Sequence, residues 1–326
     1  MKKSLIALAV LAASGASFAQ SSVSIYGIAD VWFGRTTLSN APSQIKLDSG
    51  GVSGSRFGFK GSEDLGGGLK ANFLLEQGFN IDTGAASTAG QTFSRQSYVG
   101  FSGGFGEVKL GKMWTAYDDI NGATNAVFDS ALSPQNNVWL STGYQANPNN
   151  GLYYVSPSMG GFSAAVSYAL GENKTATVDA GSVVSFNVKY EGGPVYAGLA
   201  HQREKATDAA EATNFTRVNG SYDLGVAKLL AGYGRVTGAA DTSTSEWQLG
   251  ADFPVSGALT LSAGVARSSD NAAKGDATRK GYGLGAAYAM SKRTTVYGGY
   301  QSANVAKPGV ADTDATLLAV GLKHTF

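Results

Sequence analysis

The chain contains two groups of charged residues whose types and spacing could act on ions and polar solutes. The basic group consists of Arg56, Lys60, Arg95 and Lys109. The acidic group follows in one segment and consists of Asp118, Asp119 and Asp129. Opposed charges across a narrow aqueous gap create a transverse field that orients polar solutes and ranks ions by sign. The two groups predict a charged constriction; the alternative is that they are solvated charges or structural ion pairs.

The composition gives little support to enzyme or metal chemistry. A catalytic nucleophile needs a base beside it, and the two histidines, His201 and His324, are isolated. The chain has no cysteine, so thiolate metal sites are unavailable. A glycine repeat at residues 281–285 superficially resembles a nucleotide loop but lacks the helix that would follow it. We therefore expect no catalytic residue, no metal and no cofactor.

The first 19 residues have the features of a cleaved secretory signal peptide. Lys2 and Lys3 precede an apolar run at residues 5–13, which is too short to span a membrane, and small residues lead to Ala19. Removal of residues 1–19 leaves one predicted domain, residues 20–326, with 23 basic residues (25 minus the two lysines) against 24 acidic ones. Such a balance argues against a nucleic-acid partner, which would require a positive excess.

The elements that carry the basic residues alternate with a period of two. Phe57 and Phe59 share one face of a strand, so Arg56 and Lys60 share the other. Val108 and Leu110 likewise leave Lys109 on the opposite face. An arginine or lysine facing lipid at the bilayer midplane would cost about 2–4 kcal/mol, so these residues are predicted to face the interior.

The same alternation recurs along the chain, for example at residues 162–170, 184–191, 247–253, 259–266 and 282–290. Short connectors rich in glycine alternate with long polar ones, at residues 36–53, 171–181, 203–212, 267–278 and 302–313. This pattern is typical of an up-and-down transmembrane β-barrel. The number of segments predicts an all-β antiparallel barrel of about 16 strands, wide enough for an aqueous channel.

One connector differs from the others. Residues 113–150 do not alternate and include Trp114, Tyr117, Phe128 and Trp139 besides the three acids. A structureless connection of this length is uncommon unless it has a function. Its apolar residues need a surface to pack on and its acids need water, and folding into a wide barrel would satisfy both.

Three runs resemble general porins of Gram-negative outer membranes, most closely the subgroup of the betaproteobacteria. They are SRFGFKGSEDLGGGLKA at residues 55–71, RQSYVGF at residues 95–101 and GGFGEVKLGK at residues 103–112. The likeness covers essentially the whole mature chain, from SVSIYG at residues 22–27 to KHTF at residues 323–326. It implies a passive diffusion channel for ions and small hydrophilic solutes, with the third outer loop folded inward and Arg56 and Arg95 in a basic ladder facing that loop.

The resemblance also implies partners and a location. These are a homotrimer, outer-membrane lipid and lipopolysaccharide, and the barrel-assembly machinery, which would read the terminal Phe326. Some anion-selective members carry a further arginine shortly before the strand with Tyr153 and Tyr154, whereas residues 146–150 contain none. The resemblance therefore does not extend to strong anion selectivity.

Two other classes of protein remain as alternatives. A barrel enzyme, such as an outer-membrane protease or phospholipase, would need a nucleophile and base that the sequence does not offer. A secreted β-sandwich or adhesin would make the terminal aromatic residue incidental. A sugar-specific porin, a variant of the first interpretation, would need an aromatic track along the lumen, where serine, glycine, asparagine and lysine prevail. Conductance steps in planar bilayers that occur in threes would favour the general porin.

Overall fold

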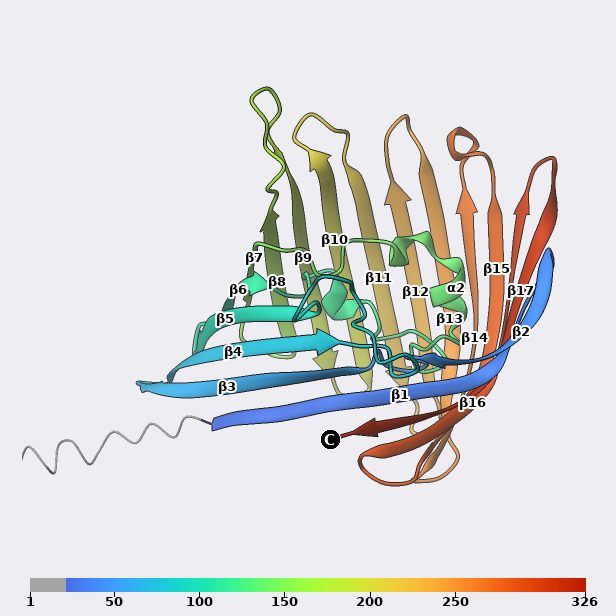
Figure 1. The fold of residues 1–326 in the computed structure, drawn as a ribbon, viewed down its shortest axis with the longest axis horizontal. Helices are drawn as coiled ribbons and strands as arrows, with labels where there is room; N and C mark the ends of the chain where they lie inside the picture. The colour runs from blue at the N-terminus through green and yellow to red at the C-terminus, as the bar shows by residue number, and fades with distance from the viewer. Residues whose placement is uncertain (1–21) are drawn as a thin grey trace, which may run out of the picture.

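A computed structural model describes residues 22–326, so the signal peptide predicted for residues 1–19 lies outside the described residues. The described chain is a single antiparallel sheet with short helical turns (Figure 1). The strands are β1 (Ser22–Leu38), β2 (Ala41–Ser49), β3 (Arg56–Gly66), β4 (Leu69–Gly78), β5 (Gln96–Gly103), β6 (Gly106–Lys112), β7 (Gly151–Val155), β8 (Phe162–Leu170), β9 (Ala180–Gly192), β10 (Val195–Thr207), β11 (Thr213–Asp223), β12 (Lys228–Thr237), β13 (Ser243–Pro254), β14 (Leu259–Asp270), β15 (Thr278–Ala289), β16 (Thr294–Lys307) and β17 (Val310–Thr325). The helical turns are η1 (Asp118–Ile120), α2 (Pro134–Val138), η2 (Leu140–Thr142) and η3 (Ala272–Lys274). No helix in this part of the chain is long and apolar enough to cross a membrane.

The sheet closes on itself because its last strand pairs with its first. β17 runs antiparallel to β1, with Thr325 opposite Ile28 at one end of the ladder. At the seam, the backbones of Gly27 and Phe326 exchange hydrogen bonds of 3.0 and 3.1 Å. Closure gives the first and last strands a partner, so neither is left as a free edge in the bilayer.

We call each strand position around the barrel wall a stave. The barrel has 16 staves although 17 strands are described, because β2 and β3 follow one another along the same stave. β1 pairs with β3 over residues Ser22 to Ile28 and with β2 over residues Val31 to Leu38. The segment at residues 50–55 interrupts the stave between the two halves. The predicted strand number is therefore confirmed, and the interruption is a feature that alternation did not indicate.

Large apolar side chains cover the outer face of the barrel. Exposed examples are Phe162, Val166 and Tyr168 on β8, Val184, Phe186 and Val188 on β9, and Trp247 and Leu249 on β13. The neighbouring positions point inward and are buried, as Ser167, Ser185, Asn187 and Gln248 are. This confirms the predicted alternation, in which apolar side chains meet lipid and polar ones line the interior.

Several of the predicted long connectors are shorter than expected. β1 and β2 leave only residues 39 and 40 between them, and β16 and β17 leave only residues 308 and 309. The prediction of loops at residues 36–53 and 302–313 is therefore wrong over most of their length. Strand pairing continues through both segments, where large apolar residues are fewer and the alternation is weaker. The connector at residues 171–181 separates β8 from β9 as expected.

Residues 113–150 pack against the inner face of the barrel, where α2 lies between the walls in Figure 1. The backbone amides of Ala116, Tyr117 and Val127 donate to Ser167, Ser185 and Ser262 at 3.1, 2.6 and 2.7 Å. The glycine repeat of β15 makes room for this segment. A Cβ on Gly281 would come within 2.7 Å of Val138, and one on Gly285 within 2.6 Å of Val127. We call residues 113–150 the inserted loop.

Candidate functional site

Arg56 and Arg95 lie side by side on the inner wall, against the interruption of the β2–β3 stave. Nε of Arg56 donates to the carbonyl of Gly54 at 2.9 Å. Nη1 of Arg95 lies 3.3 Å from the point where a Cβ on Gly54 would stand. The aliphatic part of Arg95 also crosses Gly78, which pairs with Arg56 in the sheet. Both guanidinium groups therefore sit on a surface made of glycine backbone.

Glu76 connects Arg95 with Lys60. Its side chain is 4% exposed and accepts hydrogen bonds from Nε of Arg95 and the hydroxyl of Tyr26, both at 2.8 Å. Nζ of Lys60 stands 5.1 Å from the centre of the Tyr26 ring. Lys60 itself is exposed and makes no ion pair within residues 22–326. Glu76 thus compensates one charge of the wall and leaves Lys60 free.

Lys109 is held among aromatic rings and next to an acid. Its Nζ lies 3.2 Å from Glu107 and 5.2 and 4.8 Å from the ring centres of Tyr98 and Tyr153. Cation–π contacts of this kind contribute about 0.5–1 kcal/mol at exposed sites and more when desolvated. The lysine is thereby fixed in position, and its charge is balanced by its neighbour on β6.

The acids of the inserted loop are bound to polar groups rather than to the arginines. Asp118 accepts a hydrogen bond from Tyr144, and Asp119 accepts bonds from Tyr153 at 2.6 Å and Asn187 at 2.9 Å. Asp129 accepts bonds from Asn125 and Asn136 at 2.5 and 3.1 Å. Within the described chain, no hydrogen bond or ion pair joins these acids to Arg56 or Arg95.

The surrounding protein affects the protonation of the loop acids. Burial raises the pKa of Asp118 to about 6, and the hydrogen bond from Tyr144 opposes that rise. Burial also raises the pKa values of Asp119 and Asp129. Asp119 and Asp129 are nevertheless exposed on the surface of the inserted loop, so water reaches both carboxyl groups.

Asp129 ends a strained turn. Val127, Phe128 and Asp129 all have positive φ angles, of 58°, 64° and 50°. For a β-branched residue such as Val127 this conformation is unfavourable and persists only when its surroundings enforce it. Here the turn is held by the amide of Val127, which donates to Ser262, and by Ser130, which donates to the Val127 carbonyl at 2.6 Å.

A buried arginine anchors the loop on the opposite side of the barrel. Arg217 of β11 is 1% exposed and stands between the rings of Tyr117 and Trp139, at 5.3 and 5.1 Å. It donates to the carbonyl of Asn121 at 3.1 Å and to the hydroxyl of Ser141 at 3.2 Å. These four partners belong to both ends of the inserted loop, so Arg217 joins the ends.

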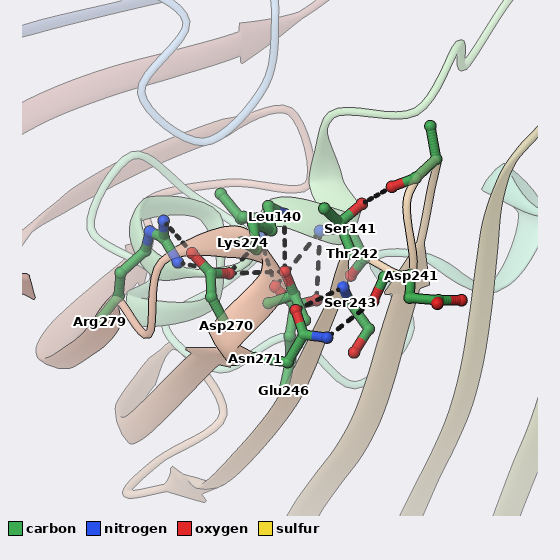
Figure 2. A network of polar contacts seen from close by, with 12 residues as sticks. Leu140, Ser141, Asp241, Thr242, Ser243, Glu246, Asp270, Asn271, Lys274 and Arg279 are labelled. Atoms are coloured by element: carbon green, nitrogen blue, oxygen red, sulfur yellow. Dashed lines mark hydrogen bonds and ion pairs between the residues drawn. The ribbon is translucent and has the colours of Figure 1, made fainter.

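Glu246 and its neighbours extend this anchor toward the strand ends. Figure 2 shows the carboxylate of Glu246 directed at the amides of Leu140 and Ser141, which begin η2. Beside it, Asp270 forms a forked ion pair with Arg279, with distances of 3.2 and 3.0 Å. The Glu246 contacts hold η2 against β13, and the Asp270–Arg279 ion pair joins the neighbouring strands β14 and β15.

The structure thus groups the predicted site residues in a way that sequence reasoning foresaw only in part. It brings Arg56 and Arg95 together at Gly54, whereas Lys60 is related to Arg95 only through Tyr26 and Glu76. It brings Lys109 to Asp119 through Tyr153, and Asp118 lies apart beside Tyr144. Glu76 and Arg217, which contact Arg95 and the inserted loop, were not singled out from the sequence. Alternation could have found Arg217, because Val218 next to it is exposed on the outer face.

A closed barrel with an apolar exterior, a polar interior and an inserted loop defines a membrane channel. Comparison with known proteins agrees, because the model of the Gram-negative porin family matches residues 5–307. The chain is 37% identical to outer membrane porin protein 32 of Delftia acidovorans and 31% identical to the major outer membrane protein P.IB of Neisseria meningitidis, with complete coverage of both chains in each case.

Among solved structures, an anion-selective porin from Comamonas acidovorans superposes with a TM-score of 0.80 at 29% identity. This match covers 94% of the present chain and all of the other. The chain therefore belongs to the Gram-negative porin family. It is a diffusion channel of the outer membrane, which it crosses with many strands, and it is not an enzyme.

Proposed function

We propose that the basic wall and the inserted loop form a charged constriction through which ions and small hydrophilic solutes diffuse. Arg56, Lys60, Arg95 and Lys109 supply the positive side. The observation that carries this proposal is the position of Asp129, which lines a cavity of about 460 Å³ together with Gly54, the residue that supports both arginines. A transverse field between such walls orients polar solutes.

The acids contribute unequally to this proposed constriction. Asp129 and Asp119 reach lumen water, and Asp119 lies near Lys109 through their shared contact with Tyr153. Asp118 is more enclosed and acts mainly on the loop itself. On the basic side, Glu76 and Glu107 compensate Arg95 and Lys109, so Arg56 and Lys60 provide the uncompensated charge.

The experiment is a reversal-potential measurement in planar bilayers under a salt gradient. The double variant Arg56→Ala/Arg95→Ala should lower the permeability ratio of anions to cations. Lys174→Ala is the control, because its ammonium is on an exposed connector and pairs with Asp179 at 2.6 Å. Reversal potentials equal to those of the unmodified channel would remove the two arginines from the constriction.

We further propose that the channel is a homotrimer embedded in lipid and lipopolysaccharide. An apolar groove on the outer face supports a subunit contact; it is lined by Val23, Ala71, Phe73, Val99, Phe101 and Leu110. Val23 and Val99 are 65% and 60% exposed in the single chain. Val99→Glu should then dissociate the assembly in detergent, as measured by light scattering, and a mass unchanged from the parent would contradict this contact.

Export and insertion complete the proposed function. Residues 1–19 would direct secretion and be cleaved, and Phe326 would be read by the barrel-assembly machinery. Phe326 is half exposed and its ring lies over Gly27, so it is accessible at the seam. Phe326→Ala should slow assembly in cells, measured as accumulation of unfolded chain. Folding of the purified variant in detergent separates an assembly defect from a structural one.

A further inference from the structure

Asp30 is a fully buried carboxylate that binds no cation in the described chain. Its oxygens instead accept hydrogen bonds from three successive backbone amides and one phenol. The donors are Gly51, Val52 and Ser53, at 3.0, 3.1 and 2.8 Å, and the hydroxyl of Tyr297, at 2.5 Å. A charged acceptor bonds such donors more strongly than a neutral one.

The backbone of Asp30 holds the same segment at its two ends. Its carbonyl accepts from the amide of Gly50 at 2.9 Å and from the hydroxyl of Ser55 at 3.1 Å. Its amide donates to the Ser55 hydroxyl at 3.0 Å. Residues 50–55 lie outside the β2 and β3 ladders, so contacts with Asp30 replace the strand pairing that the interruption removes.

Both sides of the constriction are attached to this segment. On the basic side, Gly54 accepts from Nε of Arg56 and supports Arg95. On the loop side, the carbonyl of Gly51 accepts from the amide of Ala131 at 2.7 Å, two residues after Asp129. A displacement of residues 50–55 would therefore move Arg56 and the tip of the inserted loop together.

We propose that Asp30 is a positioning residue that sets the charged constriction by fixing residues 50–55. This inference depends on the constriction proposed above. It assigns a role to a side chain that faces neither solute nor lipid. The neutral isostere Asp30→Asn would keep the volume but turn an amide donor toward backbone donors, which disrupts the contact.

The sign of the effect distinguishes positioning from simple electrostatics. Loss of a negative charge near the lumen would by itself raise the permeability ratio of anions to cations. Displacement of Arg56 should lower the permeability ratio of anions to cations, by about twofold for a charge displaced in water. We expect Asp30→Asn to lower the ratio, measured by reversal potential with the refolded full-length channel.

Asp48→Asn is the matched control. Asp48 lies on β2 opposite Trp32, and Trp32 follows Asp30 by two residues on β1. The Asp48 carboxylate pairs with Lys46 at 2.6 Å rather than with residues 50–55. This control should leave the ratio unchanged or raise it. A rise or no change in Asp30→Asn would overturn the positioning role.

Tyr297→Phe tests the same contact without a change of charge. We expect this variant to fold better than Asp30→Asn, because Asp30 keeps its three amide donors. Tyr297→Phe should lower the permeability ratio slightly and increase open-channel noise. A reversal potential and a single-channel current equal to those of the parent would contradict the proposal. Because the chain has no cysteine, a spin label at Ser53→Cys can report the mobility of the segment. That mobility should rise with Asp30→Asn.

Arg56→Ala, measured in the same series, separates this inference from the proposed function. If Arg56→Ala leaves the reversal potential unchanged, the charged constriction itself is wrong. If Arg56→Ala lowers the ratio while Asp30→Asn does not, the constriction stands and the role of Asp30 is refuted.

Discussion

The hydroxyl of Tyr153, on the barrel wall, donates a 2.6 Å hydrogen bond to the carboxylate of Asp119, in the inserted loop. The ring of Tyr153 at the same time lies under Nζ of Lys109. One side chain therefore sets the spacing between a basic residue of the wall and an acidic residue of the loop. Fixed groups of this kind determine which charges a permeating ion meets.

Removal of this hydroxyl should loosen the loop. We expect Tyr153→Phe to lower the free energy of unfolding by about 1–2 kcal/mol, because Asp119 loses one of its two donors. Single-channel recordings should also show increased open-channel noise. Tyr154→Phe is the control on the same strand, since its hydroxyl bonds the Phe105 carbonyl at 2.8 Å on the exposed side. Equal noise in the two variants would contradict the role of Tyr153.

Two lysines of the wall should differ in their effect on selectivity. Lys60 has no acidic partner in the described chain, whereas Lys109 is paired with Glu107. Lys60→Gln should lower the anion-to-cation permeability ratio by up to about fivefold, since one charge acting through water contributes about 1 kcal/mol or less. Lys109→Gln should change it less. The opposite order in reversal potentials would show that ion pairing does not govern the wall.

The glycines of β15 should be needed for the inserted loop. A Cβ on Gly283 would collide with the carbonyl of Leu132, so Gly283→Ala should displace the loop and change the single-channel conductance. Gly104→Ala is the matched control, because nothing lies within 4 Å of its Cβ position. If both variants conduct like the parent, the loop does not depend on close approach to β15.

The loop anchor at Arg217 should be essential for stability. Arg217→Met would remove buried hydrogen bonds from a charged group to Asn121 and Ser141, each worth about 1.5–3 kcal/mol. It would also remove the cation that acts on the buried carboxylate of Glu246. The thermal unfolding midpoint should fall strongly. The double variant Arg217→Met/Glu246→Gln should recover part of that loss, and failure to recover any would mean that the two charges are not coupled.

Stability should depend on pH through Asp118. Its pKa in the folded protein, about 6, exceeds the ordinary value of 3.8, so the folded state binds more protons in this window. The contribution is fully present below pH 3.8 and is lost as pH rises through about 6. Asp118→Asn should therefore be more stable than the parent at alkaline pH, with the difference shrinking toward pH 4. Thermal unfolding across this range measures it, with the exposed Asp82→Asn as control.

The barrel was predictable because strand alternation is a local signal that repeats. Phe57 and Phe59 point out and Arg56 points in for reasons contained within a few residues of sequence. The predicted loops at residues 36–53 and 302–313 were wrong because the polar residues there were interpreted as connectors, although strand pairing continues through them.

The site was only partly predictable because its contacts join distant segments. Asp30 looks like any polar inward residue of a first strand, yet its phenol donor is 267 residues away. Asp118 and Asp119 differ by one position but bind Tyr144 and Tyr153. No periodicity specifies such partners, since they depend on how the inserted loop is folded.

The seam between Gly27 and Phe326 has a consequence for biogenesis. One side of β1 pairs with β2 and β3, but the other side pairs with β17. The barrel therefore cannot close before β17 has been synthesised. A truncated chain would have two sheet edges with unpaired backbone N–H and C=O groups, and such groups are unfavourable in the hydrocarbon core of the membrane. Nonsense mutations that remove β17 should therefore abolish the closed barrel and its conductance.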